Sequence, residues 1–347
     1  MPHYLDYNAT APLLPVAREA MVAALSAANT ASMHAAGQSA AMIVDAARMT
    51  VGRLLSRDPR QVSFTSGATE ANATILRGLK TPSRPAVLTS AIEHPSVLHH
   101  ATHTIPVLPD GVIDLDVFRQ QVKALSGELA VISVMGANNE TGVLQPVAAI
   151  AEIAAEAGIP FHCDATQLIG RLPCDVPADW MTISAHKFGG PMGVGALVGE
   201  GELPPLLLGG PQERGRRAGT HNVPGIAGMG AAAEAAGRVS PDGRDALEAC
   251  CVALGGEVLG RNAPRLPNTL SVLFPVPGDL IVMALDLAGV YASNGSACSS
   301  GGAQESHVVQ AMGRRGIPVR LSLGETSDVD AVLPILEKVV QQCSVSF

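Results

Sequence analysis

The stretch DWMTISAHKFGGPMGVGALVG, residues 179–199, decides the fold of this chain. It begins and ends with apolar runs of strand length, DWMTISA and GVGALVG, which a polar, glycine-containing turn separates. Ser184 lies near the end of the first run, and His186 and Lys187 follow it directly. Because open parallel sheets bind ligands at the carboxyl ends of their strands, this turn is a candidate binding site.

The same pattern recurs upstream of this stretch. Other strand-like runs end at Thr65, Ser90, Gly136 and Asp164. Between the runs lie segments such as EANATILRGL and PVAAIAEIAAEAG, where apolar residues recur at steps of three and four, as in an amphipathic helix. This alternation predicts an α/β fold, with a large, mainly parallel sheet sandwiched by helices.

The C-terminal part predicts a second, smaller unit. A Gly/Pro/Arg-rich stretch, GGPQERGRRAGTHNVPG, leads into an Ala-rich helix over residues 226–236. Beyond it, TLSVLF and PVRLSL predict strands, and DLIVMALDLAG predicts a helix. We therefore expect a large domain over residues 16–238 and a small α+β domain formed by residues 1–15 and 239–347.

Composition excludes several classes of protein. The chain has 347 residues and a net charge of −8, which argues against the basic surface of a nucleic-acid-binding protein. No apolar run approaches the roughly 18–20 residues that span a bilayer, and MPHYLDYNATAP lacks the regions of a signal peptide. The six cysteines show no CxxC spacing. We expect a cytoplasmic protein with reduced thiols, no metal site and no membrane or nucleic-acid partner.

Cys298 has unusual neighbours. It lies in YASNGSACSSGG, residues 291–302, where the surrounding side chains are too small and polar to build a core. Buried free cysteines usually have apolar partners. The segment therefore predicts an accessible, mobile loop whose thiol serves chemistry.

Three polar clusters follow predicted strands. In FTSGATEANA, free N–H groups at the start of a helix suit a phosphate, although Ser66 as an ordinary N-cap is the alternative. Asp164 is either a satisfied cap or the partner of a cationic ring nitrogen. Lys187 is either a surface lysine or a desolvated nucleophile. A phosphate seat, an acid and a lysine are together what pyridoxal 5'-phosphate (PLP) requires.

With these clusters the chain resembles the cysteine desulfurases, in the class V aminotransferase branch of the fold-type-I PLP enzymes. The motifs follow the family's order almost from end to end. They are YLDYNATAPL, FTSGATEANA, EHPSVL, NNETGVLQP, HCDATQ, SAHKFGGPMGVGAL, ERGRRAGT, NGSACSSG and RLSLG. The resemblance implies that the large domain binds PLP and that the small one carries the cysteine loop.

The resemblance also implies catalytic roles. Lys187 is expected to hold PLP covalently and to move the α-proton of the substrate L-cysteine. Asp164 keeps the pyridine nitrogen protonated, and His94 stacks on the ring and helps with proton transfer. Cys298 takes the sulfur as a persulfide and passes it to an acceptor protein, leaving L-alanine. The acceptor pathway is iron–sulfur cluster assembly or thiolation.

Other matching residues are expected to bind the cofactor. Asn139 and Gln167 bond the phenolic oxygen of the ring. The residues expected to hold the phosphate are Ala68, Thr69, Ser184 and His186. Thr220 is expected to reach the phosphate of the neighbouring subunit's cofactor, which implies a homodimer.

Arg320 and Asn29 are expected to clasp the substrate carboxylate, since the fork of an arginine matches a carboxylate. Three of the assigned residues have plainer alternatives on sequence alone. His94 is otherwise a satisfied histidine at a strand end, Asn139 a turn residue, and Arg320 an exposed charge on an edge strand.

Some features of the sequence are compatible with other functions. Within the family, the alternative is a selenocysteine lyase or another PLP lyase or aminotransferase of small amino acids. A catalytically silent paralogue is opposed by the intact Lys187, Asp164, His94 and Cys298. GMGAAA fits a dinucleotide-binding pattern but does not follow a strand, so it predicts close helix packing. HHATH predicts an exposed helix face carrying His99 and His103.

The chain departs from the family pattern at several positions. Glu325 stands where the family often has arginine, Met192 replaces a frequent lysine, and Pro211 interrupts a turn that is usually all glycine. The small domain is also compact, and the C-terminal segment with which family members engage a scaffold protein is short. These departures leave the identity of the sulfur acceptor open.

Overall fold

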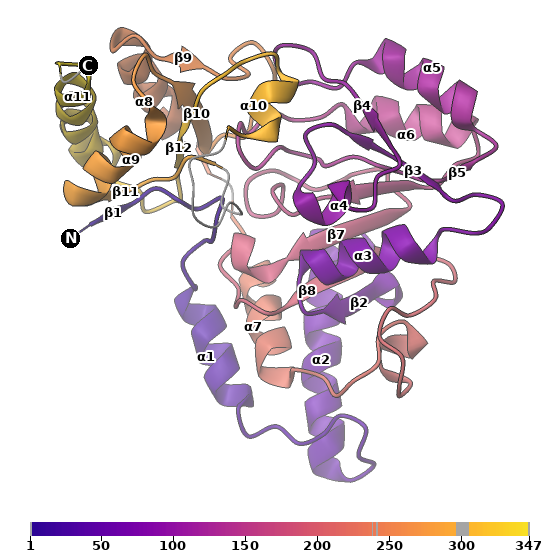
Figure 1. Cartoon of the computed structure of the whole chain (residues 1–347). Coiled ribbons are helices and arrows are strands. Elements are labelled where there is room, and N and C mark those ends of the chain that lie inside the picture. Colours follow the sequence, from indigo (N-terminus) through magenta and orange to yellow (C-terminus); the bar gives the residue numbers. More distant parts are fainter. Residues whose placement is uncertain (1, 238, 241, 296–304, 346–347) are drawn as a thin grey trace.

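The computed structural model describes residues 2–237, 239–240, 242–295 and 305–345. A seven-stranded sheet forms its centre (Figure 1), in the order β2-β8-β7-β6-β5-β3-β4. Its strands are β2 (Val62–Thr65), β3 (Ala86–Ser90), β4 (His103–Ile105), β5 (Leu129–Ser133), β6 (Phe161–Asp164), β7 (Trp180–Ser184) and β8 (Gly195–Gly199). All neighbouring pairs are parallel except those of β8 with β2 and β7. The expected mainly parallel α/β sheet is confirmed.

The central strands are buried on both faces because their sequences are continuously apolar. Side chains alternate between the faces, so Val131 and Leu197 enter one buried cluster while Ile132 and Val198 enter the other. The first cluster is covered by α3 (Ala68–Gly78) and α4 (Pro95–Leu98). The second is covered by α1 (Pro15–Ala24), α2 (Ala35–Leu54), α5 (Leu115–Leu125), α6 (Val147–Glu156) and α7 (Val223–Glu234).

Two glycines of α7 let neighbouring helices approach its backbone. A Cβ at Gly230 would lie 2.7 Å from the Cβ of Ala47 in α2, and one at Gly228 would lie 2.6 Å from Met21 Cγ in α1. The segment GMGAAA therefore serves close helix packing, as expected. It is not a nucleotide loop, because it lies inside α7 and follows no strand.

The C-terminal part forms a smaller α+β unit at the upper left of Figure 1, where both chain ends also lie. The antiparallel strands β9 (Glu257–Val258), β10 (Thr269–Leu273) and β12 (Val319–Ser322) pack with α8 (Asp242–Ala253), α9 (Gly278–Leu287) and α11 (Val329–Val345). β1 (His3–Tyr4) pairs in parallel with β11 (Val290–Tyr291), and Leu5 enters the buried cluster of this unit. The N-terminal residues thus belong structurally with the C-terminal ones.

Short helices complete the described chain. They are α10 (His307–Ala311) and the 3₁₀ turns η1 (Pro59–Gln61), η2 (Ala185–Lys187) and η3 (Gln212–Gly215). The expected helix face at HHATH is wrong, because α4 ends at Leu98 and His103 begins β4. Thr102 bonds Val87 through both backbone and side chain, which starts the edge strand there.

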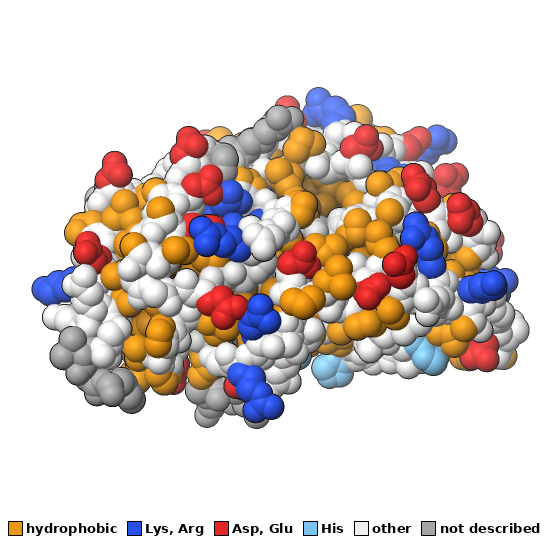
Figure 2. All heavy atoms as spheres, turned by 90° about the horizontal axis from the view of Figure 1, so that it is seen from above, with side chains coloured by type: hydrophobic (Ala, Val, Ile, Leu, Met, Phe, Trp, Pro, Cys, Tyr) orange, Lys and Arg blue, Asp and Glu red, His pale blue; other side chains and the backbone are white. Residues whose placement is uncertain are grey.

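The surface carries charged side chains of both signs (Figure 2). Figure 2 shows acidic and basic side chains interspersed over the face seen from above. Within the described residues, no helix has the length and apolar character needed to cross a bilayer.

Candidate active site

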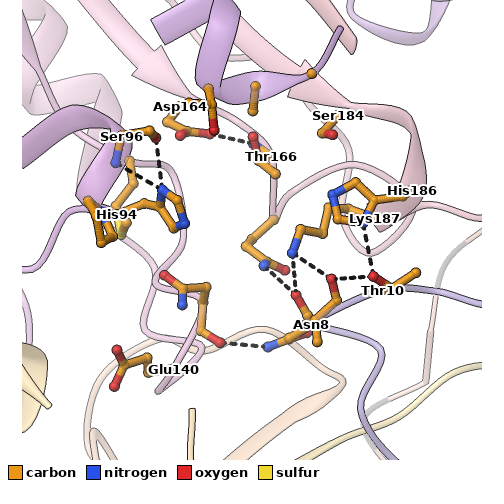
Figure 3. Close-up of a pocket in the computed structure, with 18 of the residues that line it drawn as sticks. Asn8, Thr10, His94, Ser96, Glu140, Asp164, Thr166, Ser184, His186 and Lys187 are labelled. Carbon is orange, nitrogen blue, oxygen red and sulfur yellow. Dashed lines mark hydrogen bonds between the residues drawn. The ribbon is translucent and has the colours of Figure 1, made fainter. Parts of the chain in front are cut away.

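A cavity of about 770 Å³ lies at the carboxyl ends of β6 and β7 (Figure 3). Its size is typical of a small-molecule site. Ten predicted site residues line it: Ala68, Thr69, His94, Asn139, Asp164, Gln167, Ser184, His186, Lys187 and Arg320. Asn29 and Thr220 are exposed and are not among the described residues that line the cavity. Cys298 lies outside the described residues.

Lys187 enters the cavity from η2, directly after β7. Its Nζ donates to the backbone oxygens of Asn8 at 2.7 Å and Ala9 at 2.8 Å. Burial, followed by the positive charges of Arg320 and Arg171, lowers the pKa of Lys187 to about 8. A larger fraction of the amine is therefore neutral near pH 7 than for an exposed lysine, and the neutral amine is the nucleophile.

Asp164 ends β6 and is almost fully buried. Oδ2 accepts a hydrogen bond from Asn72 Nδ2 at 2.9 Å, and Oδ1 accepts from the backbone N–H of Thr166 at 3.0 Å. These bonds fix the carboxylate at the cavity wall. A cationic ring nitrogen in the cavity is a chemically suitable partner for it.

The start of α3 forms an anion seat. The alternative reading, Ser66 as an ordinary N-cap, is wrong, because the N-cap is Gly67, which supplies no side-chain hydrogen bond. The backbone N–H of Ser66 instead donates to Glu70 Oε2 at 2.8 Å. The first turn thus has no N-cap side chain to bond its free backbone N–H groups, and its residues Ala68 and Thr69 line the cavity, an arrangement that suits a phosphate.

His186 and His94 both present neutral rings. Burial and the charge of Lys187 lower the pKa of His186 to about 4, and its Nδ1 lies 3.0 Å from Thr10 Oγ1. Burial also lowers the pKa of His94, although the negative charge of Asp164 acts to raise it. His94 Nδ1 accepts from the backbone N–H of Ser96 at 3.1 Å, and the ring faces the cavity in Figure 3. A fixed, neutral imidazole of this kind can stack on a flat ligand.

Arg320 lies in β12 of the smaller unit, lines the cavity and is almost fully buried. Its Nη1 donates to the backbone oxygen of Asn139 at 2.9 Å, and its Nη2 donates to Asp6 Oδ1 at 2.6 Å. Its Nε has no partner in the described part of the chain. Arg320 is therefore not an exposed edge charge, and it retains donor capacity for a carboxylate.

Three buried acceptor oxygens beside the cavity have no partner among the described residues: Asn72 Oδ1, Thr166 Oγ1 and Gln167 Oε1. The amide nitrogen of Gln167 is paired, because Nε2 donates to the backbone oxygen of Asn8 at 3.0 Å. Buried polar atoms are normally paired, so these atoms indicate that the cavity is completed by a polar ligand. The anion seat, the carboxylate, the amine and these acceptors fit PLP.

Sequence reasoning missed several residues of the site. Asn8 and Thr10 position Lys187 and His186, and Asn72 holds Asp164. Glu140 lines the cavity, accepts from Ser306 Oγ at 2.5 Å, and has a pKa raised by burial. The motifs YLDYNATAPL, FTSGATEANA and NNETGVLQP contain these residues, but no local pattern distinguished them.

Comparison with known proteins agrees with this geometry. The profile of the Aminotransferase class-V family matches residues 3–333. A cysteine desulfurase of Cereibacter sphaeroides is 41% identical, covering 98% of this chain and 96% of the relative. A solved NifS-like protein is 31% identical with a TM-score of 0.88, covering 99% of this chain and 100% of that chain. The solved structure described as SspA in complex with cysteine is 30% identical with a TM-score of 0.82, covering 92% and 98%.

The family profile spans most of the chain, and the cysteine desulfurase of Cereibacter sphaeroides matches nearly all of it. The cavity independently contains the lysine, the acid and the anion seat that PLP requires. The chain therefore belongs to the Aminotransferase class-V family, among its PLP-dependent cysteine desulfurases.

Proposed function

We propose that the chain removes sulfur from L-cysteine, leaves L-alanine, and carries the sulfur on Cys298 as a persulfide for an acceptor protein. The observation that carries the proposal is that Lys187, Asp164 and Arg320 all line one cavity. The role of Cys298 rests on the motif NGSACSSG. The similar SspA structure was solved in complex with cysteine, which supports L-cysteine as the substrate.

Bound PLP supplies an electron sink for the charge that forms when the substrate loses its α-proton. Lys187 would hold the cofactor and, once released by the substrate amine, would take that proton at Nζ. Its lowered pKa suits both tasks, because each requires the neutral amine. The carbonyls of Asn8 and Ala9 keep Nζ in the cavity between the two events.

Other side chains would hold the cofactor and the substrate. Asp164 would keep the ring nitrogen protonated, and His94 would lie against the ring face and assist proton transfer. The phosphate would be held by Ala68, Thr69, Ser184 and His186. Asn139 and Gln167 would contact the phenolic oxygen, and Arg320 would bind the substrate carboxylate through its unpartnered Nε.

Sulfur transfer requires Cys298 as a thiolate, because the neutral thiol is a poor nucleophile. The thiolate would attack the substrate sulfur, so that a sulfur–sulfur bond forms while the substrate's carbon–sulfur bond breaks. The bonding electrons remain on the substrate carbon, which takes up protons and leaves as alanine.

We also propose a cytoplasmic homodimer that donates sulfur to iron–sulfur cluster assembly or thiolation. Exposed apolar side chains, such as Val22 at 62% and Leu25 at 70% exposure, support burial against a second copy. The two-domain division at residues 1–15, 16–238 and 239–347 remains a proposal. Separate buried clusters support it, since Leu5 packs with the C-terminal unit.

Purified protein with PLP should be yellow and should form alanine and sulfide from cysteine and a reductant. Cys298→Ala should keep the colour but accumulate no persulfide. Lys187→Ala should contain no cofactor that borohydride can fix to the chain. Covalent cofactor in Lys187→Ala would refute the central assignment, and substrate profiling would separate cysteine from selenocysteine.

A further inference from the structure

A buried ion pair away from the cavity joins segments that are distant in the sequence. Arg48 of α2 donates from Nη1 and Nη2 to the carboxylate of Glu213, at 2.6 and 3.0 Å. His221 Nε2 donates to the same carboxylate at 2.8 Å, and its Nδ1 lies 2.8 Å from Thr30 Oγ1. We name these four residues the Glu213 network.

The Glu213 network holds an unfavourable backbone in place. Glu213 and Arg214 have φ angles of 49° and 59°, in the left-handed region that residues other than glycine rarely adopt. Glu213 and Arg48 are only 4% and 7% exposed. Burial alone would raise the pKa of Glu213, but the bonds from His221 and Arg48 outweigh it and lower the pKa to about 2. The carboxylate thus remains charged and fixes the turn.

Two residues of this network are sequence neighbours of predicted site residues that are not among the described residues lining the chain's own cavity. Thr30 directly follows Asn29, and His221 directly follows Thr220. Both Asn29 and Thr220 are exposed, and neither is among the described residues lining the cavity. The hydrogen bond between Thr30 and His221 therefore holds the segments of Asn29 and Thr220 together at the surface.

Large apolar side chains are exposed close to these two segments in the sequence. Met33 is 91% exposed close to Asn29 in the chain, and Leu208 is 86% exposed ahead of Glu213. Met192, which lines the cavity, is itself 71% exposed. Apolar side chains at both the cavity rim and the two segments are suited to burial against a second copy of the chain.

We propose that Glu213 is a positioning residue that fixes Asn29 and Thr220 as one unit for the cofactor pocket of a second copy of this chain. The inference rests on the proposed PLP-dependent function. It places Asn29 in the partner's pocket, whereas Arg320 serves its own. A role within the same chain is the competing explanation, because Arg217 of this segment donates to Glu70, which lines the chain's own cavity, at 3.0 Å.

Mixed dimers with differently tagged subunits separate the two explanations. In the first, one subunit carries Lys187→Ala and the other carries Glu213→Gln, so the only pocket with Lys187 belongs to the Glu213→Gln chain. In the second, one subunit carries both substitutions and the other carries none. Cofactor release during dialysis is followed by borohydride fixation, which counts the cofactor still bound to Lys187.

If Glu213 acts across the dimer, the first dimer should retain its cofactor as the unsubstituted protein does. The second dimer should release its cofactor about tenfold faster, since the contact of Thr220 with the charged phosphate is weakened. The reverse result, equal release in both dimers, or a protein that remains monomeric would overturn the proposal. Covalent cofactor in the Lys187→Ala homodimer would instead overturn the proposed function.

Two further variants guard against a simple loss of folding. His221→Ala keeps the pair between Arg48 and Glu213 but cuts the link to Thr30, and it should also speed release. Glu248→Gln removes a carboxylate that also has two cationic partners, in this case Arg261 and Arg265, and it should leave release unchanged. Thermal unfolding of each variant checks its fold. If Glu248→Gln releases cofactor as fast as Glu213→Gln, the effect is not specific and the proposal fails.

Discussion

The two sides of the cavity are built in different ways. On the strand side, Asp164 and Lys187 follow neighbouring parallel strands, and the pairing of Asp164 with Thr182 sets their spacing. On the other side, Asn8 and Arg320 come from opposite ends of the chain and meet through the backbone of Asn139. The first side depends on local sheet geometry, whereas the second depends on the packing of the smaller unit.

This difference suggests a division of labour. The strand side would carry the chemistry of the cofactor, and the chain-end side would select and orient the substrate. Variants on each side should therefore change different kinetic constants.

The largest effect is expected on the strand side. Asp164→Asn should lower kcat by about 100-fold or more, because an amide cannot keep the ring nitrogen protonated. Alanine formation measures the loss, and the absorbance of the bound cofactor shows that the pocket is still filled. Asp179→Asn is the matched control, since Asp179 accepts from Phe161 N–H at 2.8 Å at the other end of the strands. An unchanged kcat in Asp164→Asn would show that the strand side does not carry the chemistry of the cofactor.

On the chain-end side, Arg320→Lys should mainly raise KM for cysteine, by about tenfold or more. The charge is kept, but the fork that bonds Asp6 and Asn139 and leaves Nε free is lost. Steady-state kinetics give the two constants. Arg314→Lys, which alters an exposed pair with Glu257, should change neither. A fall in kcat with KM unchanged would place Arg320 with the chemical step instead.

The pH dependence of cofactor capture connects the two sides. Capture of PLP by the cofactor-free protein requires neutral Lys187, whose pKa is lowered to about 8 by burial and then by Arg320. The capture rate should therefore rise about tenfold per pH unit below pH 8 and level off above it. Stopped-flow absorbance measures this rate. A midpoint near 10 would show an ordinary lysine, whereas Arg320→Gln should move the midpoint upward.

The smallest effect is expected at the contact between the sides. Thr10→Val removes the hydroxyl that bonds His186 Nδ1 and should weaken cofactor binding by about threefold, with kcat nearly unchanged. Thr50→Val removes an exposed hydroxyl bond within α2 and serves as the control. Equilibrium titration with PLP compares them, and a loss of kcat without weaker binding would contradict the assignment.

The strand side could be predicted from the sequence, while most of the chain-end side could not. Asp164, Ser184 and Lys187 follow apolar runs, so the rule for strand ends locates them. Arg320 could be assigned only from family resemblance, because nothing near it shows that β12 approaches the cavity. Asn8, Asn72 and Glu140 were missed, since their roles depend on contacts between distant segments.

The same limit applies to helices and caps. The sequences of α1 and α2 show no clear apolar periodicity because small residues dominate their buried faces, as at Ala17, Ala40 and Ala47. Ser66 was a plausible cap by residue type, but Glu70 takes its backbone N–H and Gly67 becomes the N-cap. In both cases tertiary contacts decided the outcome.

The pairing of Asp6 with Arg320 has a consequence for protein synthesis. β12 is one of the last segments to leave the ribosome, and the bridge between Asp6 and Ser322 forms only after that. A nascent chain that stops before β12 already contains Lys187 and Asp164 but lacks Arg320, the partner of Asp6. The substrate-binding side of the cavity is therefore completed only when nearly the whole chain has been synthesised.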